Sequence, residues 1–134
     1  MTHRSGKHPK LTNNEFLVME TLLNFHGALS AYTILDQLRE SGFRAPLQVY
    51  RALDKLLEYG MVHRIESKNA FIACQCPDDK SHARVAFTIC ESCGDVSEIF
   101  DNAFDKHLEN LANTNGFVPR KSTVELSGFC STCG

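Results

Sequence analysis

Residues 46–74 read PLQVYRALDKLLEYGMVHRIESKNAFIAC, and this stretch decides the fold. Pro46 suits the first turn of a helix, and apolar residues follow it at helical spacing as far as Gly60. Residues 61–66 and 70–74 then predict two short strands joined by a polar turn. A short helix can enter a major groove and a hairpin can touch the flanking phosphates, so the stretch predicts the recognition helix and wing of a winged helix-turn-helix domain.

The residues before this stretch predict two further helices. Thr12 followed by Glu15 is a capping-box pattern, and it predicts a helix over about residues 13–26. Ser30 is suited to cap the next helix, and a glycine follows each of the two helical patterns. We therefore expect a winged-helix DNA-binding domain over residues 1–74.

The second half of the chain predicts a smaller unit. Residues 75–84 are polar and rich in turn formers, which predicts a hinge. In residues 85–134, Asp101 is suited to cap a helix, and strands are expected over 85–89, 96–100 and, in two pieces, 117–118 and 123–129. A sheet of this size buries only a small hydrophobic core. We therefore expect a C-terminal α/β domain that dimerises through a strand edge. The predicted fold class is α+β.

Charge is divided unevenly along the chain. Residues 1–70 contain nine Lys and Arg against seven Asp and Glu, a net charge of +2, whereas residues 71–134 contain five against nine, a net charge of −4. This direction fits an N-terminal half that faces nucleic acid. The chain has no apolar run near the ~20 residues of a membrane helix and no signal-peptide pattern at its start, so the expected location is the cytoplasm.

The strongest chemical signal is a pair of Cys-x-x-Cys-Gly motifs. Cys90 and Cys93 form the first motif, Cys130 and Cys133 form the second, and 36 residues separate them. Two such turns supply the four thiolates of a tetrahedral structural zinc site, and the long spacing indicates that they come from separate strands. A redox dithiol pair or free buried thiols are the alternatives, although a redox pair needs only one such motif.

Further metal donors fall near the junction of the two halves: His63, Cys74, Cys76, His82 and Glu98. His63 lies on the first predicted wing strand, Cys74 ends the second, and His82 lies in the predicted hinge. A site built from both halves would make their relative orientation depend on metal. The alternatives are a surface histidine at the base of a hairpin and a solvated glutamate on a strand.

No catalytic constellation is visible. A zinc deaminase needs His-x-Glu and then Pro-Cys-x-x-Cys, but His63 and Glu66 have the wrong spacing and Ile89 precedes Cys90. The sequence therefore predicts a protein that is not an enzyme. A zinc-dependent or thiol-redox enzyme and a zinc-ribbon interaction module without DNA affinity are the rival classes.

These motifs together carry a resemblance. Residues 49–53 (Val-Tyr-Arg-Ala-Leu), residues 60–64 (Gly-Met-Val-His-Arg) and the two cysteine pairs resemble the ferric uptake regulator family of bacterial metal-sensing repressors, from about Leu11 to the last residue. Within that family the chain is most similar to the zinc uptake regulator branch. The resemblance implies a homodimer with two zinc ions per subunit, one structural on the four motif cysteines and one regulatory.

The resemblance implies the regulatory ligands as well: His63, Cys74, His82 and Glu98. The iron-sensing branch instead has a His-His-Asp-His run where this chain has Ser81-His82-Ala83-Arg84. A thiolate ligand also favours zinc over ferrous iron. Cys76 has no counterpart in the resemblance. The expected function is a repressor of zinc-uptake genes that binds operator DNA when zinc is bound, with an iron- or manganese-responsive regulator as the alternative.

The resemblance finally implies which residues contact operator double-stranded DNA. Tyr50 and Arg51 lie on the recognition helix, where arginine suits bidentate readout of guanine; a core aromatic is the alternative for Tyr50. Further base or phosphate contacts are expected from Tyr32, Gln48, Lys55, Arg64 and Lys68. Asp36 and Arg39 match a pair that bridges neighbouring dimers on DNA in this branch, although by themselves they are an ordinary i, i+3 helix pair.

Overall fold

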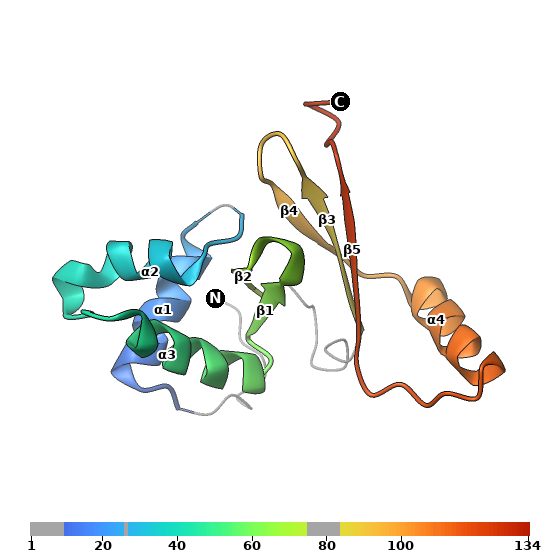
Figure 1. Cartoon of the computed structure of the whole chain (residues 1–134), viewed down its shortest axis with the longest axis horizontal. Helices are drawn as coiled ribbons and strands as arrows, with labels where there is room; N and C mark the ends of the chain where they lie inside the picture. The colour runs from blue at the N-terminus through green and yellow to red at the C-terminus, as the bar shows by residue number, and fades with distance from the viewer. Residues whose placement is uncertain (1–9, 26, 75–83) are drawn as a thin grey trace. The chain divides into compact units, whose positions relative to one another are not determined.

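The computed structural model describes residues 10–25, 27–74 and 84–134. The chain divides into two compact units, Met1–Gln75 and Cys76–Gly134 (Figure 1). The predicted hinge at 75–84 lies almost entirely outside the described residues. The first unit contains α1 (Asn13–Leu23), α2 (Ala31–Leu38), a 3-10 turn (Arg39–Ser41), α3 (Pro46–Glu58), β1 (Val62–Ile65), a second 3-10 turn (Glu66–Lys68) and β2 (Ala70–Ala73).

The capping box predicted for the first helix is present. The Thr12 N–H donates to Glu15 Oε1 at 3.1 Å, and the Glu15 N–H donates to Thr12 Oγ1 at 3.2 Å. The predicted end of this helix near residue 26 is wrong, because α1 ends at Leu23. The Asn24 N–H still donates to the Glu20 carbonyl at 3.1 Å, but the Phe25 N–H donates to the Leu22 carbonyl at 3.3 Å, a 3-10 pattern that ends the α-helix.

The start of α2 also follows the sequence prediction. The Ser30 hydroxyl accepts a hydrogen bond from the Thr33 N–H at 3.2 Å. After the 3-10 turn, Gly42 adopts φ of 105°, a left-handed conformation that favours glycine. This residue reverses the chain between α2 and α3, so that both helices can pack on one core.

The helices and one face of the hairpin share a single hydrophobic core. Val18, Ile34, Val49, Leu53 and Leu56 are fully buried in it. Burial of these side chains from three helices fixes how the helices cross, and each large apolar side chain contributes about 1.5–3 kcal/mol.

The β1–β2 hairpin has two distinct faces. Val62 pairs with Ala73 and His63 pairs with Ile72 in an antiparallel register. Val62 and Ala73 belong to the helical core. Because successive side chains of a strand point to opposite faces, His63 lies on the other face of the hairpin.

The second unit contains β3 (Arg84–Cys90), β4 (Val96–Ile99), α4 (Asn102–Thr114) and β5 (Ser122–Gly128). β3 is the central strand of the sheet, antiparallel to β4 and parallel to β5. The prediction that Phe117 and Val118 belong to a strand is wrong, because β5 begins only at Ser122. These two residues lie in the connection that returns the chain from α4 to the parallel strand.

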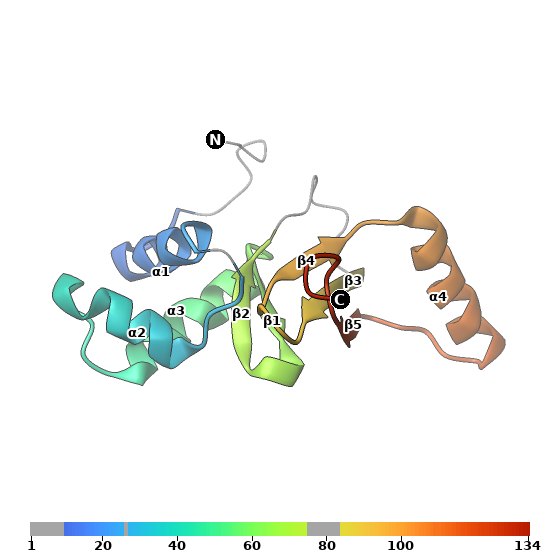
Figure 2. The ribbon, with the colours of Figure 1, turned by 90° about the horizontal axis from the view of Figure 1, so that it is seen from above.

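α4 is amphipathic, and the described part of its unit leaves it largely uncovered. The Asp101 carboxylate accepts from the N–H groups of Ala103 and Phe104, at 2.9 and 3.3 Å, as the predicted cap requires. None of the residues of α4 is buried, and the helix stands clear of the sheet in Figures 1 and 2. Large apolar side chains are exposed in and beyond this helix: Phe100, Leu111, Phe117, Val118, Leu126 and Phe129.

The architecture confirms the predicted α+β class. Over residues 10–25, 27–74 and 84–134, three α-helices carry a two-stranded hairpin, and a three-stranded mixed sheet follows with one α-helix. None of the helices in the described ranges has both the length and the apolar character that a bilayer crossing requires.

Candidate functional site

The parallel pairing of β3 with β5 brings the two cysteine motifs together. Cys90 at the end of β3 pairs with Gly128 at the end of β5, and the Glu91 N–H donates to the Gly128 carbonyl at 2.7 Å. Each motif forms the turn that directly follows its strand. Because parallel strands end at the same edge of a sheet, the two turns lie side by side there.

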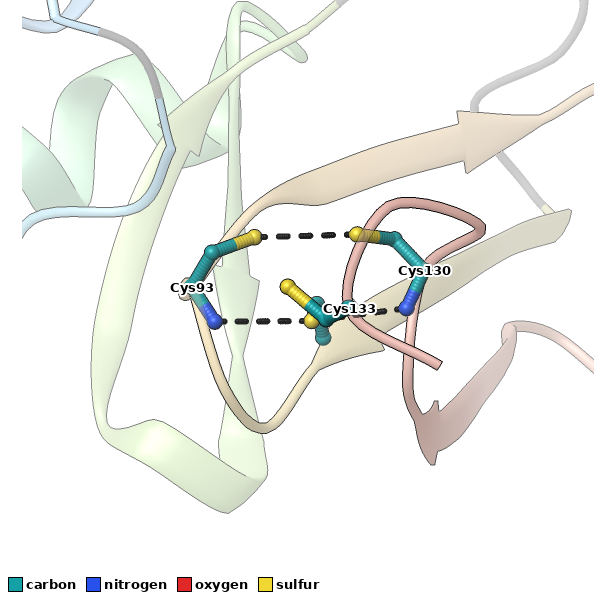
Figure 3. A group of neighbouring side chains, drawn as sticks. Cys93, Cys130 and Cys133 are labelled. Carbon is teal, nitrogen blue, oxygen red and sulfur yellow. Dashed lines mark hydrogen bonds between the residues drawn. The ribbon is translucent and has the colours of Figure 1, made fainter.

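The four thiols have the geometry of a tetrahedral zinc site. The sulfur atoms of Cys90, Cys93, Cys130 and Cys133 all lie within 4.8 Å of one another. A zinc ion with four thiolates at about 2.3 Å requires sulfur atoms about 3.8 Å apart. The Cys93 and Cys130 sulfur atoms are 3.9 Å apart, and in Figure 3 they point toward each other and toward Cys133. The donor set therefore fits zinc.

The protein backbone prepares this site for negative charge. The N–H groups of Cys93 and Cys130 each donate to Cys90 Sγ at 3.4 Å (Figure 3). They lower the pKa of the Cys90 thiol to about 6. The pKa of Cys133 is raised to about 12, chiefly because its side chain hydrogen-bonds that of Cys130. At neutral pH a bound dication would stabilise all four side chains as thiolates together.

A second pair of metal donors lies on the wing. The Cys74 N–H donates to the Met61 carbonyl at 2.9 Å, which extends the β1–β2 ladder by one pair. His63 and Cys74 are therefore diagonal neighbours on the same face of the hairpin. A ring nitrogen of His63 lies within 4.8 Å of Cys74 Sγ. None of the described cysteines, Cys74 included, is in a disulfide. An imidazole and a thiol at this separation can hold one zinc ion after small side-chain rotations.

The other predicted regulatory ligands belong to the second half of the chain. Glu98 lies on β4, where it pairs with Phe87 of β3. His82 lies outside the described residues, as does Cys76. The first unit by itself thus supplies two of the four predicted donors.

The predicted DNA contacts on α3 lie mainly on its exposed side. Arg51 is exposed, and Lys55 is exposed and pairs with Glu58 at 3.6 Å between Nζ and Oε1. Tyr50 is half-buried and packs against the core. Tyr50 therefore fits both interpretations, because one part of its ring packs in the core while another part remains accessible.

Gln48 has a structural role in addition to its predicted DNA contact. Its Oε1 accepts hydrogen bonds from the N–H groups of Arg44 and Ala45, at 2.6 and 3.1 Å. The side chain thereby satisfies two backbone donors at the start of α3. A glutamine at the third helical position is the known signal for this half of a capping box.

The wing holds its arginine through a residue that was not predicted. One guanidinium nitrogen of Arg64 donates to Asn69 Oδ1 at 2.7 Å, and another lies 3.8 Å from Glu66 Oε1. The guanidinium carbon is 5.9 Å from the centre of the Phe71 ring. Asn69 has φ of 49°, a left-handed conformation that asparagine tolerates in turns, and this preference was the available signal. Lys68, in the 3-10 turn of the wing, is exposed.

The remaining predicted contacts lie on α2 and on the first residue of the 3-10 turn that follows it. Tyr32, in the first turn, is exposed. Arg39 Nε lies 3.2 Å from Asp36 Oδ1, and both side chains are mostly exposed. The predicted i, i+3 pair is therefore formed within one chain and remains open to solvent.

Comparison with known sequences adds a family match. The sequence model of the family described as "Ferric uptake regulator family" matches residues 7–127 of this chain. The chain is 39% identical over 125 residues to the zinc uptake regulation protein of Escherichia coli K12, which covers 92% of this chain and 72% of that protein.

Two solved structures are similar over nearly the whole chain. One is described as a zinc uptake regulator complexed with zinc and DNA, with a TM-score of 0.85, 38% identity and coverage of 92% of this chain and 82% of that one. The other is the holo form of XcZur, with a TM-score of 0.84, 36% identity and coverage of 96% and 89%.

Proposed function

The chain belongs to the ferric uptake regulator family, and from that premise we propose that it is a zinc-responsive transcriptional repressor. It acts in the cytoplasm, binds operator double-stranded DNA as a homodimer when zinc is bound, and represses zinc-uptake genes. Membership of a family of transcription regulators decides against the enzyme alternative.

The observation that carries the choice of zinc is the wing pair. His63 and Cys74 present an imidazole nitrogen and a thiol within 4.8 Å of each other. A thiolate ligand selects zinc over ferrous iron or manganese, which prefer nitrogen and oxygen donors. The similarity to a zinc uptake regulator complexed with zinc and DNA points in the same direction.

Two zinc ions per subunit are proposed. The structural ion is held by Cys90, Cys93, Cys130 and Cys133. This assignment is supported by their sulfur atoms, which all lie within 4.8 Å of one another. His63, Cys74, His82 and Glu98 hold the regulatory ion. The first two are supported by the geometry of the wing, and the last two by the family resemblance of the sequence.

The proposed mechanism follows from where the regulatory ligands lie in the chain. A bound zinc ion supplies a single positive centre that four donors can share. His63 and Cys74 tie the wing to that centre, and His82 and Glu98 tie the following segment and the second unit to it. Fewer orientations of the winged-helix domains remain, and those that match successive major grooves gain population. A coupling of ~3 kcal/mol would tighten operator binding about 150-fold.

The homodimer is proposed from the second unit. α4 has no buried residue, and large apolar side chains around it are exposed. An amphipathic helix is stable when its apolar face is covered, and a second copy of the same unit offers a matching face. Asp36 and Arg39 are proposed to join neighbouring dimers on DNA.

The proposed DNA-binding surface is built around α3, α2 and the wing. Arg51 and Tyr50 read bases, Tyr32 adds a contact from α2, and Gln48 contributes through its free amide nitrogen. Phosphate contacts come from Lys55, Arg64 and Lys68, which are exposed or held at the surface of the wing.

The test is operator binding at buffered free zinc, with a duplex selected from random-sequence DNA by the zinc-loaded protein. His82→Ala should remove the zinc dependence of binding while the dimer stays folded with its structural zinc. Ser81→Ala, one residue away, is the matched control and should respond to zinc as the parent protein does. If the affinity of His82→Ala still rises with zinc, the regulatory site is assigned wrongly. If iron or manganese activates binding and zinc does not, the choice of metal is wrong.

A further inference from the structure

α3 separates its side chains into two faces, and Leu47 stands at the start of the exposed one. The buried face consists of Val49, Ala52, Leu53 and Leu56, each at most 4% exposed. The opposite face consists of Leu47, Arg51, Asp54, Lys55 and Glu58, all exposed. Leu47 and Arg51 are four residues apart, so their side chains are neighbours on the helix surface.

Leu47 is the apolar member of an otherwise charged face. Its side chain is 56% exposed, whereas Tyr50 and Leu57 of the same helix pack against the core. Single exposed leucines are common on protein surfaces, so exposure alone assigns no role to Leu47. Its position beside Arg51, in the first turn of the recognition helix, is the distinguishing feature.

The first turn of α3 is held in place before any ligand arrives. Pro46 occupies the first helical position and fixes its own φ. Gln48 Oε1 accepts from the N–H groups of Arg44 and Ala45, at 2.6 and 3.1 Å, and so ties the turn to the preceding loop. Leu47 lies between these two anchors. Its side chain can therefore be positioned in a groove with little loss of backbone freedom.

We propose that Leu47 reads the C5-methyl group of a thymine in the major groove, next to the base that Arg51 contacts. The inference rests on the proposed function, in which α3 enters that groove. Residues in the first turns of a recognition helix are those that reach base edges. Leucine has no hydrogen bond to offer a phosphate or a polar base edge. The thymine methyl is the apolar group that the major groove presents, so it is the matching partner.

The experiment removes that methyl group from the DNA and, separately, its partner from the protein. A duplex is selected from random-sequence DNA by the zinc-loaded full chain, and each thymine is then replaced singly by deoxyuridine. One replacement per half-site should weaken binding by the parent protein about fourfold, the value of one buried methyl group. Leu47→Ala should bind the thymine duplex about fourfold more weakly and should not distinguish thymine from deoxyuridine there.

Two further variants make the result specific. Leu47→Gln, of similar length but polar, should also lose the distinction between thymine and deoxyuridine. Leu23→Ala removes a leucine that is 62% exposed at the end of α1 and should keep the full distinction. Zinc content and circular dichroism establish that each variant is folded.

The outcomes separate this inference from the function on which it rests. If every deoxyuridine is tolerated by the parent protein, or if Leu47→Ala and Leu47→Gln keep the sensitivity of the parent, the assignment of Leu47 is overturned while the repressor function stands. If no duplex is bound in a zinc-dependent way, the proposed function is overturned and this inference with it.

Discussion

The two groups of metal donors differ in how much of each site one unit of the chain supplies. The sulfur site at the end of β3 and β5 has all four ligands within the second unit. The wing pair has two, His63 and Cys74, and the other two proposed ligands come later in the chain. A site that is complete within one unit can stabilise only that unit. A site that borrows ligands from elsewhere in the chain couples metal binding to the arrangement of the units, so the first suits structure and the second suits sensing.

The largest effect is expected from breaking the complete site. Cys133→Ser should cost the protein at least one zinc ion per chain and should unfold the second unit, because structural zinc sites in small peptides contribute ~10–16 kcal/mol and the described core of this unit is small. Metal analysis and near-ultraviolet circular dichroism measure the loss. Ser131→Ala changes the same turn without touching a ligand and should leave both unchanged. Retention of full zinc content in Cys133→Ser would disprove the four-thiol assignment.

The next effect is expected from breaking the shared site. Cys74→Ala should lower operator affinity at saturating zinc by up to about 150-fold, because the coupling between the two binding events is lost. With zinc supplied only at a level that fills the structural site, the thermal stability of the second unit should not change, since none of its side chains is altered. Fluorescence anisotropy with a selected duplex and calorimetry report the two quantities. A fall in the stability of the second unit would show that the wing pair is not separate from the structural site.

Graded metal removal should reproduce the difference without mutation. A weak chelator should first remove one zinc ion per chain and abolish DNA binding, while the ellipticity of the protein stays constant. The same chelator should cause no further loss of binding in Cys74→Ala, because that variant has already lost the ion in question. Mass spectrometry under native conditions counts the zinc ions that remain on each chain. Release of both ions in one step would contradict the division into structural and regulatory sites.

The smallest effect is expected from a pair that belongs to neither site. Asp36→Ala removes the 3.2 Å contact with Arg39, which is exposed and should contribute only a few tenths of a kcal/mol to stability. Both zinc ions should remain, and a single dimer should bind one half-operator as before. Only cooperative binding of a second dimer, measured by gel shift on a long duplex, should weaken. Unchanged cooperativity would remove Asp36 from the proposed dimer–dimer contact.

Local sequence signals were confirmed where the interaction spans a few residues. The pairing of Thr12 with Glu15 and the caps at Ser30 and Asp101 all form as expected. The Cys-x-x-Cys spacing likewise indicated a sulfur site whose thiols the structure brings within 4.8 Å. Each cap, and each Cys-x-x-Cys turn taken singly, depends on residues whose separation is fixed by a helical turn or a tight loop.

Signals failed where the deciding interaction lies far along the chain. Phe117 and Val118 have the composition of a strand, but they lie in the connection before β5. Gln48 caps the backbone before α3, a short-range role for which the sequence did hold a signal, and its DNA contact stays a prediction. The polarity of a side chain does not by itself determine which partner it contacts.

The sequence alone determined the class of the fold, the helix caps and the two cysteine motifs, because these follow from short-range spacing and from the chemistry of thiols. Only the tertiary structure decided that β5 pairs parallel to β3, which places the two motifs at one sheet edge. It also decided that the hairpin register sets His63 beside Cys74 and that packing of the opposite face of α3 leaves Leu47 exposed. Strand pairing and the choice of a buried face join residues whose separation along the chain is not fixed by local geometry, so they are settled by packing.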